Sequence, residues 1–188
     1  SMITKKALAA SVKELMAKRS LTKISVSDIA QNCGLNRQTF YYHFKDKYDL
    51  VNWIYYDQVV SPILENSTLG ELETDMRRVL LVMERDMDFY IGALNLSGQN
   101  AFREYLFDIT YKLILEAVDE LDQEDHLPKG DREFIAQFCT HGLVGVIEDW
   151  AKSGMKESAD HLADHLRRVV DDNTLMAIQR VRTPCNRE

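Results

Sequence analysis

The feature that most constrains this chain is an apolar pattern of helical period that recurs along nearly its whole length. In the first such stripe, Leu8, Val12, Leu15 and Met16 lie at i, i+4, i+7 and i+8 and so share one helix face. The 188 residues include only 8 Gly and 3 Pro, whereas a β-sandwich or barrel needs a turn signal every ~8–12 residues. The sequence therefore predicts an all-α fold.

The first fifty residues contain several short helices marked by their end signals. Ser25 with Asp28 three residues later resembles a capping box that opens a helix through about Cys33, and Gly34 can end it in the left-handed conformation. Asn36 is the expected N-cap of a helix over 37–44, and Asp46 that of a helix from 47 to about 60, with Pro62 disturbing its end. The spacing predicts a three-helix unit with a tight turn, which is the helix-turn-helix pattern.

The remaining residues predict longer helices. Apolar stripes indicate helices over 72–87, 102–117, 131–153 and 158–172, with Asp131 and Ser158 as the N-caps of the last two. Gly142 and Gly145 lie inside the third, and we expect them to let another helix come close, because each costs ~1 kcal/mol relative to Ala in a helix interior. We expect a helix-turn-helix domain at 1–50 and a helical-bundle domain at 51–188.

The distribution of charge also separates the first quarter of the chain from the remainder. Residues 1–47 contain nine Lys or Arg and three Asp or Glu, although the whole chain has a net charge of −7. A basic first quarter joined to an acidic remainder indicates that only the first quarter meets a polyanion.

The helix predicted over 37–44 has the right size and pattern to enter DNA. Phe40 and Phe44, at i and i+4, would anchor it on the core, which leaves Arg37, Gln38 and Tyr42 for other faces. A helix fits the ~12 Å major groove and reaches base edges with its N-terminal residues.

Three segments carry a resemblance to a known family. They are Ile-Ser-Val-Ser-Asp-Ile-Ala at 24–30, Cys-Gly-Leu-Asn at 33–36 and Thr-Phe-Tyr-Tyr-His-Phe-Lys-Asp-Lys at 39–47, followed by Leu50. Together they resemble the N-terminal domain of the TetR family of bacterial transcriptional regulators, over about residues 4–55. Gln38 departs from a Gly that is frequent there and Cys33 from a common Ala, so the base preference of relatives does not transfer to this chain.

The resemblance implies a role for each matching position. Ser25 and Ser27 would contact backbone phosphates; Arg37, Gln38, Thr39 and Tyr42 would face the groove; Tyr41, His43 and Lys47 would hold phosphates. Arg suits guanine and Gln suits adenine, so Arg37 and Gln38 are the expected readers of sequence. The alternative is that Tyr41 and Tyr42 are core aromatics. In the same way, Arg37 and Lys47 would be solvated charges.

The C-terminal body carries a looser resemblance. Phe89-Tyr90, Gly-Gln-Asn-Ala-Phe at 98–102, Phe138, Gly142 to Gly145, Trp150 and Gly154 resemble the branch that includes regulators of dihydroxyacetone kinase operons. The family implies a homodimer made by the last two helices of each subunit in a four-helix bundle. Intramolecular packing of the same stripes is the alternative.

Candidate ligand sites in the body are weaker. Met83, Met87, Tyr90, Phe102, Tyr105 and Trp150 could line an effector pocket, although residues at helical spacing are more often core. His161 and His165 stand at i and i+4, a spacing that suits a metal, but no third ligand is evident. We therefore expect a solvated face there, and neither a metal nor a cofactor.

Several classes are disfavoured. The longest uncharged runs have 14 residues, short of the ~20 of a spanning helix, so no membrane partner is expected. Cys33, Cys139 and Cys185 form no disulfide framework or zinc motif, which favours a reducing, cytoplasmic setting. No catalytic motif is visible, so an enzyme is not expected.

The sequence predicts a transcriptional regulator that binds double-stranded DNA at a palindromic operator as a homodimer. A small-molecule effector or a co-regulator protein would switch it. The alternative is an all-α ligand-binding or adaptor protein that acts on transcription through a protein partner.

Overall fold

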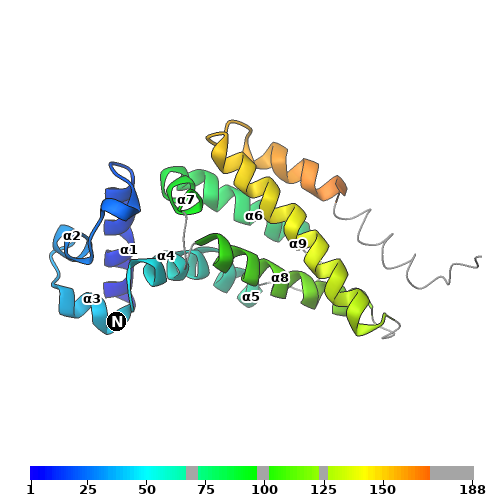
Figure 1. Cartoon of the computed structure of the whole chain (residues 1–188), viewed down its shortest axis with the longest axis horizontal. Helices are drawn as coiled ribbons and strands as arrows, with labels where there is room; N and C mark the ends of the chain where they lie inside the picture. Colours follow the sequence, from blue (N-terminus) through cyan, green and yellow to red (C-terminus); the bar gives the residue numbers. More distant parts are fainter. Residues whose placement is uncertain (67–71, 97–101, 123–126, 170–188) are drawn as a thin grey trace, which may run out of the picture.

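The computed structural model describes residues 1–66, 72–96, 102–122 and 127–169, and all regular structure in these ranges is helical. The first helices form a compact head, at the left of Figure 1. They are α1 (Met2–Met16), the 3₁₀ turn η1 (Leu21–Lys23), α2 (Val26–Asn32), α3 (Arg37–His43) and α4 (Lys47–Tyr55). The prediction of an all-α fold is confirmed.

The helix that leaves the head runs further than predicted. α4 continues through a π-helical segment, η2 (Tyr56–Val60), into α5 (Ser61–Asn66), and so links head and body. Pro62, expected to disturb the end of this helix, lies at the second position of α5. The wider π turn just before it accommodates a residue that lacks a backbone N–H.

The body consists of α6 (Leu72–Arg85), α7 (Met87–Leu94), α8 (Phe102–Leu121), α9 (Lys129–Lys152) and a helix over 159–169. The helix predicted over 72–87 is present as α6 but ends at Arg85, because the chain breaks at Asp86 before α7. The predicted start of α9 is wrong: it begins at Lys129 after Pro128, and Asp131 lies in its first turn. Residues 98–101, which are part of the looser family resemblance, lie outside the described residues. So do residues 170–172, the end of the helix predicted over 158–172.

One continuous core joins head and body. Leu8, Val12 and Ile29 lie at its head end, and Ile54, Leu80 and Met83 carry it into the body. A smaller cluster, with Val118 and Leu127, fills the distal end of α8 and α9. Because α4 contributes buried side chains to the same core, its position fixes how the head sits on the body.

Candidate nucleic-acid interface

The turn between α2 and α3 is built from local backbone chemistry. Gly34 has φ +71°, and the Leu35 N–H donates to the Ala30 carbonyl (2.8 Å) in the Schellman pattern that ends α2. Asn36 then caps α3: its Oδ1 accepts from the Thr39 N–H (2.8 Å) and from the Thr39 hydroxyl (3.1 Å). The predicted glycine turn and Asn36 cap are confirmed.

α3 has one buried face and one open face. Phe40 and Phe44 are buried, with their ring centroids 5.8 Å apart, and Phe44 packs on Trp53 of α4. Tyr41 and Tyr42 are 50% and 83% exposed. The core reading of the two phenylalanines is confirmed, and the alternative that these tyrosines are core aromatics is wrong.

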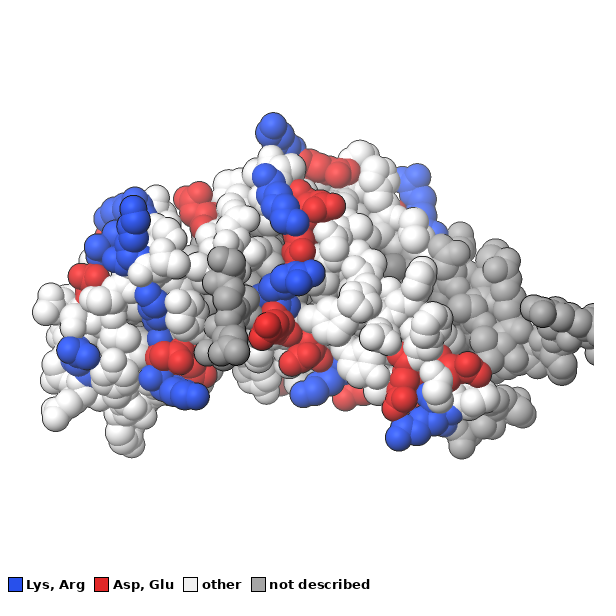
Figure 2. All heavy atoms as spheres, in the orientation of Figure 1, with Lys and Arg blue, Asp and Glu red and all other residues white. Residues whose placement is uncertain are grey.

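The structure places all nine predicted DNA-contact residues on the head. Ser25, Arg37, Gln38, Tyr41 and Tyr42 are exposed, and Ser27, Thr39, His43 and Lys47 are partly exposed. They lie at the start of α2, along α3 and at the start of α4. On the face in Figure 2, Lys and Arg side chains gather over the upper part of the head.

Ser25 is engaged within its own helix. Its hydroxyl accepts from the Asp28 N–H (3.1 Å) and lies 2.9 Å from Asp28 Oδ2, which also accepts from the Ser25 N–H (2.8 Å). These hydrogen bonds hold the pKa of the Asp28 carboxyl below its usual value. The predicted capping box is confirmed, and it fixes the N-terminus of α2.

The Lys47 ammonium makes hydrogen bonds within the head that the sequence does not indicate. Its ammonium donates to the carbonyls of Leu21 (2.7 Å), Ile24 (2.8 Å) and Thr22 (3.3 Å) around η1. Burial lowers the pKa of this ammonium, and nearby Asp28 opposes the shift. An ammonium has three protons, so a phosphate contact at Lys47 requires at least one carbonyl to be exchanged.

His43 lies among cations at the end of α3. Burial, the chain's amino terminus and Lys5 together lower the pKa of its imidazole. Its ring meets the edge of Tyr42, with centroids 4.9 Å apart. A neutral imidazole can still donate to an anion, and an anion beside it would favour protonation.

Sequence reasoning missed the polar contact between head and body. Lys13 of α1 pairs with Asp86, and its ammonium also donates to Gln58 Oε1 of η2 (3.0 Å). Tyr90 donates to the same Gln58 oxygen (3.3 Å). Burial alone would raise the pKa of Asp86, but hydrogen bonds from Arg85 and Lys13 lower it. No short sequence signal marks these residues, because they lie far apart in the chain.

The six predicted effector-pocket residues do not share one environment. Tyr90 and Phe102 are buried and pack with Tyr105 around Tyr55, an aromatic that the sequence did not single out. Met83 and Trp150 are also buried, whereas Met87 lies at the surface. A cleft of about 340 Å³ lies elsewhere, between α1 and the α4–η2 helix, and Lys13 and Gln58 are among its lining residues.

Among the described residues, no helix is long and apolar enough to cross a membrane.

Comparison with known proteins matches both parts of the chain. A family model described as "Bacterial regulatory proteins, tetR family" matches residues 8–54, and one described as "Transcriptional regulator C-terminal region" matches residues 70–172. The HTH-type dhaKLM operon transcriptional activator DhaS of Lactococcus lactis subsp. lactis (strain IL1403) is 28% identical over 152 residues, 79% of this chain and 80% of the relative.

Solved structures share the fold. The dihydroxyacetone kinase operon activator DhaS aligns with a TM-score of 0.75 at 21% identity, over 94% of this chain and 98% of that one. The fatty acid degradation regulator FadR from Bacillus halodurans aligns with a TM-score of 0.65 at 17% identity, over 89% and 94%.

Proposed function

Because this chain belongs to the TetR family of bacterial transcriptional regulators, we propose that it binds a palindromic operator as a homodimer and is switched through its body. Residues 1–50 read DNA in this proposal, and residues 51–188 dimerise and receive the signal. The observation that carries it is the two-faced α3: Phe40 and Phe44 are buried, while Arg37, Gln38 and Tyr42 face solvent.

The exposed face of α3 suits the major groove. Arg37 and Gln38, in the first turn, would meet base edges with Thr39 and Tyr42, since the N-terminal residues of a recognition helix reach them. The Arg37 guanidinium lies 5.8 Å from the ring centroid of Tyr41, which orients it without burying it. Flanking phosphates would be held by Ser25, Ser27, Tyr41, His43 and Lys47.

Exposed apolar residues on α9 support the homodimer. Phe134 and Phe138, one turn apart, are 66% and 71% exposed. A Cβ added at Gly142 or Gly145 would meet nothing within 4 Å, so packing among the described residues does not explain these glycines. Large apolar side chains beside open glycines fit a second copy of α9, which would bury the rings and approach the glycines closely.

Switching requires a signal in the body to change the placement of the heads. Two heads read successive major-groove faces only when ~34–36 Å apart, so a ligand that prefers another spacing would release DNA by population shift. The Lys13–Asp86 pair and the shared Gln58 contact join α1 to the body and support this coupling. A small molecule or a co-regulator protein could supply the signal.

A gel shift on inverted-repeat DNA from upstream of the protein's own gene tests the proposal. We expect binding at low salt that weakens as salt rises, with two chains per operator. Arg37→Ala should weaken binding by ~1–3 kcal/mol, and Lys112→Ala, at an exposed site on α8, should not. Absence of a shifted band at low salt would contradict the proposal.

A further inference from the structure

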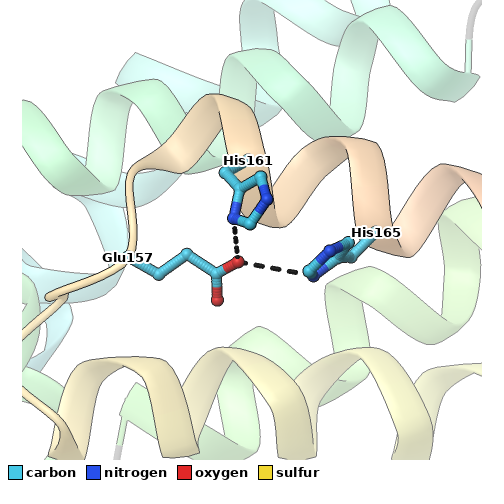
Figure 3. Close-up of side chains that lie close together, drawn as sticks. All are labelled: Glu157, His161 and His165. Carbon is cyan, nitrogen blue, oxygen red and sulfur yellow. Dashed lines mark ion pairs between the residues drawn. The ribbon is translucent and has the colours of Figure 1, made fainter.

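In the structure a carboxylate lies beside the two histidines of the helix over 159–169. Glu157 Oε1 lies 2.6 Å from His161 Nδ1 and 3.3 Å from His165 Nδ1 (Figure 3). One potential ligand atom from each residue falls within 4.8 Å of the other two. We propose that Glu157, His161 and His165 form a binding site for a divalent transition-metal cation of the Zn²⁺ type.

The three side chains have the chemistry of such a site. Two imidazole nitrogens and one carboxylate oxygen suit Zn²⁺, Co²⁺, Ni²⁺ and Cu²⁺, whereas Mg²⁺ and Ca²⁺ prefer sets made of oxygen alone. Ligand atoms around a tetrahedral Zn²⁺ lie ~3.3 Å apart, as follows from metal–ligand distances of ~2.0–2.1 Å. The observed separations are close enough that small side-chain rotations reach this geometry, with water completing the coordination.

The backbone around the ligands is held by contacts from other helices. The Trp150 indole of α9 donates to the Glu157 carbonyl (2.8 Å), and the Ala159 N–H donates to Glu84 Oε1 of α6 (2.8 Å). These bonds hold the backbone at Glu157 and Ala159, and so they fix the position from which the Glu157 side chain extends. Metal ligands with a fixed backbone lose less conformational freedom on binding, because their supporting contacts already orient them.

Solvent reaches the site, and a neighbouring carboxylate is paired with another helix. The side chains of His161 and His165 are more than half exposed, and Glu157 is partly exposed. Asp160, on the same helix, pairs with Arg77 of α6 (2.8 Å). The imidazole rings lie 4.4 Å apart and tilted by 52°, so their nitrogens converge on one carboxylate oxygen.

Sequence alone did not reveal this third ligand. The i, i+4 spacing of the histidines was visible, but Glu157 precedes Ser158, whose hydroxyl accepts from the His161 N–H at the helix start. Helical periodicity does not specify how a chain enters a helix. The entry follows from Gly154 (φ +81°) and Met155 (φ +51°), which turn the chain after α9.

Calorimetric titration of the full chain, free of any affinity tag, with Zn²⁺ tests the site. We expect one ion per chain, no comparable binding of Mg²⁺, and a Co²⁺ complex whose visible absorption reports nitrogen and oxygen ligands. Glu157→Gln and His165→Asn should each weaken binding by more than the ~10–100-fold that loss of an outer-shell partner costs.

His141→Asn is the matched control. His141 is exposed on α9 and its ring lies against Phe107, so it belongs to no ligand set with Glu157. Zn²⁺ should raise the melting temperature of the wild type and of this control, but not of the two ligand variants. Circular dichroism checks that each variant is folded. Binding that is equally tight in the wild type and in the folded Glu157→Gln and His165→Asn variants would overturn the proposal.

Discussion

Lys47 is the residue whose structural role can be separated most sharply from a role in DNA binding. Replacing it with Met keeps the apolar stem and removes the ammonium that joins α4 to η1. The partly buried carbonyls of Leu21 and Ile24 then lose a charged donor. Hydrogen bonds to charged groups contribute ~1.5–3 kcal/mol, and water replaces part of this at a partly exposed site.

We therefore expect Lys47→Met to lower the free energy of unfolding by about 2 kcal/mol. For a chain of this length that corresponds to a fall of ~4–8 °C in the melting temperature. Thermal unfolding followed by circular dichroism measures it. Lys45→Met is the matched control, because Lys45 is exposed and carries the same charge, and it bonds to Asp49 through its backbone N–H. Equal melting temperatures for the two variants would refute the structural role of the ammonium.

The same two variants test the phosphate contact that the family resemblance implies. If Lys47 exchanges a carbonyl for a phosphate when DNA binds, Lys47→Met should weaken binding to all DNA sequences alike. It should also lower the slope of log binding constant against log salt concentration by about one unit. Fluorescence anisotropy over a salt series, at a temperature where both variants are folded, measures this. A changed base preference would contradict the phosphate assignment.

Gln38→Ala should reduce the discrimination between bases at one operator position by ~1–3 kcal/mol, as measured by competition binding. An unchanged base preference would show that Gln38 does not read the sequence. Phe138→Glu should yield monomers in sedimentation analysis while Gln137→Glu does not, and a dimer that survives Phe138→Glu would move the interface away from α9. Burial raises the pKa of Tyr55 and of Tyr90 above the usual value of 10, so the folded chain keeps protons that the unfolded chain releases. The free energy of unfolding should therefore keep its full value below about pH 10 and fall above it. In Tyr55→Phe this fall should be less steep by ~1.4 kcal/mol per pH unit. Identical slopes for the wild type and the variant would contradict the assignment.

Features set by neighbours in sequence were predictable. The Ser25–Asp28 box, the positive φ of Gly34 and the burial of Phe40 and Phe44 each follow from rules that span a few residues. The candidate interface depends on these short-range features, and for that reason the sequence could predict the short helices on which its residues lie.

Features set by contacts between distant residues were not predictable. The break at Asp86 coincides with its ion pair to Lys13, 73 positions earlier in the chain, and the Lys47 ammonium is bound by carbonyls more than 20 residues away. Local periodicity says nothing of either partner. The approach of Glu157 to the histidines is nearer in sequence, but it depends on a turn that helical spacing cannot describe.

Selection of bound sequences from a random pool of duplex DNA tests the central claim most directly, because it measures binding, symmetry and spacing together. The account predicts enrichment of an inverted repeat whose half-sites lie about one helical turn apart, and loss of that enrichment in Arg37→Ala. Recovery of no sequence at low salt, or of a motif without two-fold symmetry, would contradict it.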